Sequence, residues 1–359
     1  MIGRTLFGYL FWRQIAMIGW LLLGTLGLIA MIDLTETISR YSDEDAFTLG
    51  RALLIVALHM PPLLEQVLPF AVLLASMLTL VRLNRRYELV VARSIGVSAW
   101  GFLLPVVAAS FLVGLVSLFT LNPIAAASVR MEEELQVRLF DNASDGERAL
   151  WLRQGSGSGS IIISATQVLS GGTILRSPVL YRIGPTGEMI DRIDATSARL
   201  VPGEWRLSNA VRSQAGQRPE ALGSARLRTL VEPEMVAQRS TPPEATPFLA
   251  LFGRIDTLQR LGLPHSPFTM QLQSLLTRPV LFVAMTLIAG TVTLRFARFG
   301  QTRTVVLGGL AAAFILYVVT VLVQAFGSAG LVPPVAAAWT PVLAALLFGA
   351  AVLLRTEDG

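Results

Sequence analysis

The hydrophobic positions of this chain are gathered into long blocks without charge. Five blocks approach or exceed about 18 residues; they are Ile15–Ile32, Gln66–Val81, Ala99–Asn122, Thr304–Leu331 and Leu331–Leu354. About 20 apolar residues cross the hydrocarbon core of a bilayer as a helix. A sixth block, Pro279–Leu294, is short, and we expect it to extend through Leu272–Thr277 across Arg278. The pattern predicts an α-helical polytopic membrane protein with six transmembrane helices.

The middle of the chain, from about residue 122 to residue 270, has a different pattern. Its apolar runs have the length of strands, and glycine and proline residues separate them, as at Ser160–Ser164, Pro178–Ile183, Glu204–Leu207 and Ala225–Leu230. Short strands with turn residues between them indicate an antiparallel sandwich or barrel. We therefore expect a jelly-roll-like β domain, inserted between the third and the fourth transmembrane helix.

Two other segments of this region have patterns of their own. Gly155–Ser160 contains only glycine and serine, which is typical of a flexible loop. Prolines at 242, 243 and 247 indicate a linker, and we expect Phe248–Leu261 to form a helix that leads back to the membrane. The expected division is therefore 1–121 for three transmembrane helices, 122–270 for the β domain and linker, and 271–359 for three more helices.

The arginines are distributed unevenly over the segments that join the blocks. If the N-terminus lies inside, the short outer loops hold only Arg40 and Arg51. Ten arginines then lie inside: Arg4, Arg13, Arg82, Arg85, Arg86, Arg93, Arg295, Arg298, Arg303 and Arg355. Cytoplasmic segments of membrane proteins carry such an excess of basic residues. We therefore expect both termini in the cytoplasm and the β domain outside, and the net charge of +5 does not indicate nucleic-acid binding.

The composition excludes several kinds of chemistry. The chain has no lysine, so it has no nucleotide-binding loop of the form GxxxxGK[ST]. It has no cysteine, which excludes disulfides, thiolate metal sites and thiol nucleophiles. His59 and His265 belong to no HExxH motif and have no cluster of carboxylates next to them in the sequence. We therefore predict no catalytic, metal or cofactor site.

One carboxylate lies close to the membrane part of the second expected helix. Glu65 stands between Pro61-Pro62 and Pro69, at the outer end of that helix. Ionisable residues at this depth either reach the aqueous interface or mark a functional internal site. We favour an interfacial carboxylate in contact with water, and a role in an internal cavity is the alternative.

The segment between the second and the third expected helix has an amphipathic pattern. Tyr87, Val91 and Ile95 recur at i, i+4 and i+8, which places them on one face of a helix. The charged residues off this face are Arg86, Glu88 and Arg93. Periodicity leaves two interpretations open: an amphipathic helix on the membrane surface, or a coupling helix near 84–98 that docks into a cytoplasmic partner.

Motifs in the same part of the chain resemble those of the LptF/LptG permeases of lipopolysaccharide export. The resemblance begins with Pro61, Pro69, Ala71 and Leu73-Leu74, and its most specific part is Glu88–Ser98. The order of three helices, a β domain and three helices agrees with this family. Segments of the expected β domain resemble the LptG branch, namely Leu150–Leu152, Ile190–Thr196 and Glu204–Ser208.

This resemblance implies a non-catalytic permease subunit of an ABC transporter in the bacterial inner membrane. Such a subunit pairs with an LptF-like permease, sits on an LptB-like ATPase dimer and works with an LptC-like membrane-anchored protein. Together they extract lipopolysaccharide and pass it to a periplasmic bridge. The missing ATP site is then expected, because the energy enters through the partner at the coupling helix. Glu88 matches the family's acidic contact to the ATPase, and Tyr87, Arg86 and Arg93 lie beside it.

The resemblance also implies lipid contacts. In the family the interior of the β domain takes up acyl chains, and the candidates to line it here are Ile162, Leu180, Trp205 and Leu207. LptG-type proteins often carry several basic residues at the outer end of the first helix, where they meet lipid A phosphates. Here Asp33 and Glu36 occupy that end and Arg40 is its only basic residue. Either the native lipid carries fewer phosphates or another subunit supplies the charge.

Two other functional classes compete with a transporter subunit. A mechanotransmission protein would move a periplasmic domain without carrying a lipid through its own helices, but such proteins commonly have four transmembrane helices rather than six. A membrane-embedded hydrolase or transferase would need a polar catalytic set at membrane depth, which the sequence lacks. Co-purification of a cytoplasmic ATPase would distinguish a transporter subunit from both.

Overall fold

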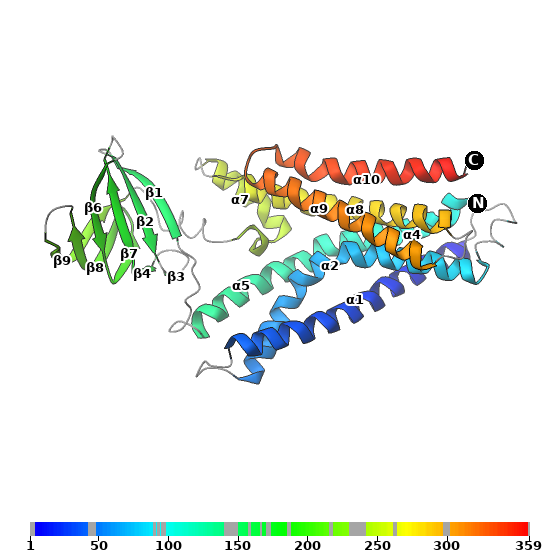
Figure 1. The fold of residues 1–359 in the computed structure, drawn as a ribbon, viewed down its shortest axis with the longest axis horizontal. Coiled ribbons are helices and arrows are strands. Elements are labelled where there is room, and N and C mark those ends of the chain that lie inside the picture. Colours follow the sequence, from blue (N-terminus) through cyan, green and yellow to red (C-terminus); the bar gives the residue numbers. More distant parts are fainter. Residues whose placement is uncertain are drawn as a thin grey trace. The chain divides into compact units, whose positions relative to one another are not determined.

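The computed structural model describes two compact units. The described residues are 4–41, 48–88, 91, 94, 98–139, 150–156, 159–165, 167–169, 174–184, 188–214, 218–229, 242–260, 264–296 and 302–357. One unit is helical and comprises Met1–Glu133 and Pro243–Gly359, and the other is a β-sheet within Glu134–Pro242 (Figure 1). An inserted β unit between two halves of a helical unit is the predicted fold class.

The helical unit contains six helices that are long and apolar enough to cross a membrane, which confirms the predicted number within the described residues. Its elements are α1 (Arg4–Tyr41), α2 (Leu49–Arg85), α4 (Ala99–Val116), the π-helix η1 (Ser117–Leu121), α5 (Asn122–Leu139), the 3-10 turn η3 (Pro243–Ala245), α7 (Phe248–Arg260), α8 (Ser266–Phe296), α9 (Thr302–Ser328) and α10 (Pro334–Glu357). Helix α8 continues through Arg278, as the short sixth block required. Helix α7 forms where the sequence predicted a helix after the linker.

The third apolar segment continues past the expected boundary at residue 121. Pro123 lacks an N–H group, which interrupts the usual α-helical hydrogen bonds. The helix continues here through the π-helical turn η1, in which Asn122 N–H donates to Ser117 O. Helices α4 and α5 therefore form one apolar segment, Trp100–Glu132. The buried Asn122 side chain accepts a hydrogen bond of 2.8 Å from the N–H of Phe248, which fixes the start of α7.

Helix α8 is the centre of the helical unit. It packs against α2, α4, α9 and α10, and 67% of its most apolar 18-residue stretch is buried inside the chain. At Gly114 the backbone of α4 approaches Pro279 of α8 so closely that a Cβ atom there would lie 2.5 Å from Pro279 Cα. A glycine is therefore required at this crossing.

Helix α1 is the opposite case. Only 6% of its most apolar 18-residue stretch is buried inside the chain. Its buried positions in the first half are Leu10, Gln14 and Ile18, at i, i+4 and i+8. Gly24 and Gly27, further along, have open space where a side chain would be. The first half of α1 is thus held by this chain, and the stretch around Gly24 and Gly27 is open to lipid or to another subunit.

The β unit is a nearly closed antiparallel sheet (Figure 1). Its strands are β1 (Leu150–Ser156), β2 (Gly159–Ala165), β3 (Gln167–Leu169), β4 (Ile174–Arg176), β5 (Val179–Ile183), β6 (Met189–Asp194), β7 (Ser197–Val201), β8 (Glu204–Ser213) and β9 (Glu220–Arg228). Their order in the sheet is β1-β2-β5-β6-β8-β7-β4-β3, and β9 pairs with β8. The four strands expected from the apolar runs are all present, as β2, β5, β8 and β9.

One expectation for this unit is wrong. Gly155–Ser160 was expected to be a flexible loop, but Gly155 pairs with Ser160 and Ser156 pairs with Gly159 in the ladder between β1 and β2. Strands β1 and β2 extend into this segment, because backbone hydrogen bonds do not depend on side chains and glycine tolerates the extended backbone. Low complexity therefore did not indicate a loop here. Residues 157 and 158 lie outside the described residues.

Candidate functional site

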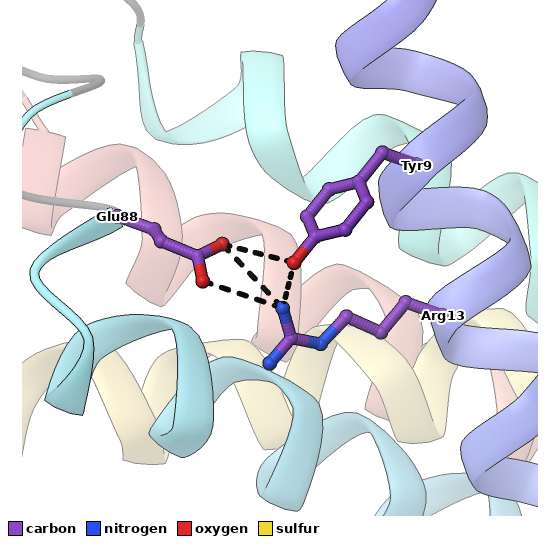
Figure 2. A network of polar contacts seen from close by, with 3 residues as sticks. All are labelled: Tyr9, Arg13 and Glu88. Atoms are coloured by element: carbon purple, nitrogen blue, oxygen red, sulfur yellow. Dashed lines mark hydrogen bonds and ion pairs between the residues drawn. The ribbon is translucent and has the colours of Figure 1, made fainter.

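Glu88 lies where α1 approaches the segment that follows α2. Tyr9 donates a hydrogen bond of 3.3 Å to Glu88 Oε2, and Arg13 Nη1 lies 3.4 Å from both carboxylate oxygens. Arg13 also donates to the Tyr9 hydroxyl. Figure 2 shows Tyr9 and Arg13 directed from α1 toward Glu88. The Glu88 side chain is still 34% exposed, so the contact positions its carboxylate without enclosing it.

The backbone around Tyr87 sets the position of Glu88. Helix α2 ends at Arg85, and Tyr87 has a φ of 57°, in the left-handed region that non-glycine residues seldom adopt. Val91 N–H then donates to Tyr87 O at 2.9 Å, which begins a new helical turn. The helical turn of the expected coupling segment near 84–98 therefore starts at Glu88. The turn at Tyr87 separates it from α2, so it does not continue that helix.

The other predicted coupling residues are exposed where the structure describes them. Tyr87 is 70% exposed and Val91 59% exposed, and Arg86 is exposed as well. Arg93 lies outside the described residues. Tyr87 and Val91 are thus available at the surface of the chain, although Tyr87 itself belongs to the turn, and Ile95 lies outside the described residues.

Glu65 is buried, contrary to the interpretation that we favoured. Its side chain is 8% exposed, and its Oε2 lies 2.7 Å from Nη1 of Arg278 in α8. Glu65 Oε1 has no hydrogen-bond partner among the described residues. Glu65 precedes Arg85 by roughly twenty residues, or about 30 Å along the helix, which is the thickness of the hydrocarbon core. The carboxylate is therefore about one membrane thickness away from the arginine that ends α2, and an arginine from a distant segment shields it from solvent.

The acidic end of α1 also has a partner that the sequence did not reveal. His59 of α2 lies between two carboxylates, with Nδ1 at 2.9 Å from Asp33 Oδ2 and Nε2 at 3.0 Å from Glu132 Oε1 of α5. Two carboxylate acceptors require both ring nitrogens to donate, which is the charged form of histidine. Asp33, His59 and Glu132 therefore join α1, α2 and α5 through two ion pairs. The side chain of Arg40 lies outside the described part of the structure.

The interior of the β unit contains three of the four predicted lining residues. Leu180, Trp205 and Leu207 are at most 2% exposed and belong to one apolar cluster. The Trp205 indole N–H is buried without a hydrogen-bond partner among the described residues. Ile162 is half-buried and points to the opposite face of β2 from its neighbours Ile161 and Ile163, which are in the cluster.

Comparison with known families decides the class of protein. Residues 8–355 match the family described as the lipopolysaccharide export system permease LptF/LptG, which is nearly the whole chain. The chain belongs to the LptF/LptG family. A comparison with curated proteins finds no match. Membership of this family confirms the predicted function: the protein is a multi-pass permease of the lipopolysaccharide export system and a non-catalytic transmembrane subunit.

The functional residues of this permease that the sequence analysis missed are the contact partners of the predicted residues. Tyr9, Arg13 and Arg278 each contact a residue that we had singled out, but they come from other parts of the chain. A signal was present for two of them: Tyr9 and Arg13 are one helical turn apart, directly before the first uncharged block. The sequence had no signal for the pairing of Arg278 with Glu65.

Proposed function

We propose that the chain is the LptG-type subunit of the lipopolysaccharide exporter. The resemblance of Leu150–Leu152, Ile190–Thr196 and Glu204–Ser208 to that branch supports this choice. These segments belong to strands β1, β6 and β8 and to the residues beside them, so the resemblance covers parts of three of the nine described strands. The subunit pairs with an LptF-like permease and an LptC-like membrane-anchored protein.

The orientation of this subunit follows from its arginines. Both termini lie in the cytoplasm of a bacterium, and the β unit lies in the periplasm. The ten-to-two distribution of arginines supports this orientation. The beginning of α1 and the end of α10 lie at the same end of the helical unit, as six crossings require (Figure 1).

Energy reaches the subunit through an LptB-like ATPase dimer that docks at the segment beginning with Glu88. The observation that carries this proposal is the position of Glu88. Its side chain is partly exposed just after the turn that ends α2, and Tyr9 and Arg13 of α1 hold it. A carboxylate held by one helix and open on its other side is suited to a basic groove on a partner. Tyr87 and Val91 add exposed apolar area next to it.

We expect Glu88→Ala to weaken docking of the ATPase. Removal of one member of an interfacial charge pair leaves the other charge partly desolvated and unpaired, and because Glu88 is only half-buried we expect the low end of the usual cost, about 2 kcal/mol. That corresponds to roughly 30-fold weaker docking. Glu88→Arg should be worse, because it also repels Arg13. The measurement is recovery of the ATPase with the purified chain, followed by ATP-driven lipid release from proteoliposomes.

A matched control removes a carboxylate that has no proposed partner outside the chain. Asp256 is exposed and pairs with Arg260 one turn along α7, so Asp256→Ala makes the same change in net charge. It should leave ATPase recovery and lipid release unchanged. Normal recovery and normal release in both Glu88 variants would rule out the coupling role of Glu88.

The β unit receives the lipid after it leaves the membrane. Its nearly closed sheet and the apolar cluster around Leu180, Trp205 and Leu207 support a role in holding acyl chains. Ile162 is on the other face of β2 and is therefore not proposed as a lining residue.

A further inference from the structure

A cluster of polar side chains lies inside the helical unit, apart from the contacts of Glu88, Glu65 and His59. It consists of Gln14 of α1, Ser76 of α2, Ser110 of α4 and Thr286 of α8, all 0% exposed. Gln14 Nε2 donates to Ser76 Oγ at 2.8 Å, Ser76 Oγ lies 3.2 Å from Thr286 Oγ1, and Thr286 donates to Ser110 Oγ at 2.7 Å. This polar cluster joins four helices.

The polar cluster lies at membrane depth. Ser76 precedes the arginine at the end of α2, Arg85, by roughly nine residues, or about 13 Å along the helix. No water competes for hydrogen bonds at that depth, so polar side chains bond to one another or to the backbone. The four helices α1, α2, α4 and α8 are therefore fixed to one another at this level by directional bonds as well as by apolar packing.

The polar cluster is directly connected to the contact at Glu88. Gln14 follows Arg13 in α1, and Arg13 pairs with Glu88. Gln14 is also the middle of the three buried positions, Leu10, Gln14 and Ile18, by which the first half of α1 is held. One turn of α1 thus contacts both the coupling segment and the interior of the bundle, so a displacement of Glu88 that moves Arg13 also moves Gln14.

The bonding of Gln14 is incomplete in this arrangement. Its Oε1 is buried and has no hydrogen-bond partner among the described residues. A buried acceptor without a partner carries a desolvation cost that a bond would relieve. A shift of α1 that brings a donor to this oxygen would relieve that cost and so offset part of the free energy of the movement.

We propose that Gln14 is a positioning residue for transport, which relays the state of the Glu88 contact to α2, α4 and α8 through the polar cluster. This inference rests on the proposed role of Glu88 in coupling. Gln14 touches neither the lipid nor the ATPase in this account. It acts by holding the first half of α1 in register with the core of the bundle.

The test measures ATP hydrolysed per lipid released by the assembled complex in proteoliposomes. We expect Gln14→Leu, which keeps the volume but removes the amide, to raise this ratio about fivefold. Thr286→Val, which removes the hydroxyl at the centre of the cluster, should act in the same direction. The matched control is Thr291→Val in the same helix, because the buried Thr291 hydroxyl donates within α8 to Ile288 O and not across to another helix. Its ratio should equal that of the wild type.

Combination with Glu88→Ala distinguishes relay from a local loss of packing. If Gln14 acts through Glu88, adding Gln14→Leu to Glu88→Ala should change the ratio no further, whereas independent effects multiply. A multiplied ratio would overturn the proposal, as would a ratio for Gln14→Leu and Thr286→Val no higher than for Thr291→Val. If Glu88→Ala alone leaves docking and the ratio normal, the proposed coupling role fails first and the relay fails with it. If Gln14→Leu does not assemble, the smaller change Thr286→Val decides by the same criteria.

Discussion

We expect Arg278→Gln to lower the apparent melting midpoint of the purified protein by about 5–10 °C. The change leaves the Glu65 carboxylate buried without its cation, because that side chain is 8% exposed and its other oxygen already lacks a partner among the described residues. Removal of one partner from a buried ion pair costs about 3–5 kcal/mol. For a unit of about 250 residues, the size of the helical unit, such a loss corresponds to that shift of the midpoint.

Two further variants test whether the pair, and not the arginine alone, is responsible. The double variant Glu65→Gln/Arg278→Gln removes both charges and should recover most of the lost stability, because two neutral amides leave no buried charge. Arg260→Gln breaks the exposed pair with Asp256 and should shift the midpoint by less than about 2 °C. Equal midpoints for the single and double variants would contradict the ion pair.

We expect Asp191→Asn to destabilise the β unit by a similar amount. The Asp191 side chain is 0% exposed, and it accepts bonds of 2.6 Å from Arg182 Nε and from Arg212 Nε. Neutralising it leaves two guanidinium groups against a buried amide, at a cost of about 3–5 kcal/mol. Amide exchange in strands β5, β6 and β8, measured on the full chain, should accelerate by about a hundredfold or more.

The pH dependence of this effect has a definite sign. The hydrogen bonds and charges of Arg182, and then those of Arg212, hold the pKa of Asp191 below its usual range. A lowered pKa in the folded state stabilises the protein above the ordinary carboxyl pKa, about 4, and this contribution is lost as the pH falls through the lowered value. Wild-type protection should therefore decline below about pH 4 more steeply than that of Asp191→Asn.

A matched variant completes this test. Asp194→Asn removes an exposed carboxylate that pairs with Arg192 in the same strand. It should leave amide exchange in the β unit nearly unchanged. If the two variants accelerate exchange equally, burial of Asp191 is not the source of its contribution.

The elements of this fold were predictable because each follows a local rule. A helix in a bilayer needs about 20 apolar residues in a row, so the helices appear directly as uncharged blocks. The strands of the β unit appear as short apolar runs between turn residues, such as the run that became β5. The same reasoning extended α8 correctly across Arg278, because the block beyond it was too short by itself.

The pairings between elements were not predictable in this way. Glu65 was favoured as a carboxylate in contact with water because nothing near it in the sequence neutralises its charge, and its partner Arg278 is more than two hundred residues away. His59 and Asp33 likewise meet only after α1 and α2 pack together. Periodicity also placed Tyr87 on a helix, whereas Tyr87 lies in the turn that ends α2. Its backbone adopts the left-handed region, and a non-glycine residue that does so has no reliable sequence signal.

The most direct test of the account is capture of lipopolysaccharide by the β unit during ATP hydrolysis. A photo-crosslinking residue is placed at Leu180, in the apolar interior, and in a matched protein at Ile162, on the other face of the sheet. Each protein is reconstituted with its partner permease, its ATPase and lipopolysaccharide in proteoliposomes. We expect lipopolysaccharide to be captured at Leu180 when ATP is supplied, and not without ATP or at Ile162. Capture that is absent at Leu180, or equal with and without ATP, would contradict energy-driven transfer of lipid into this unit.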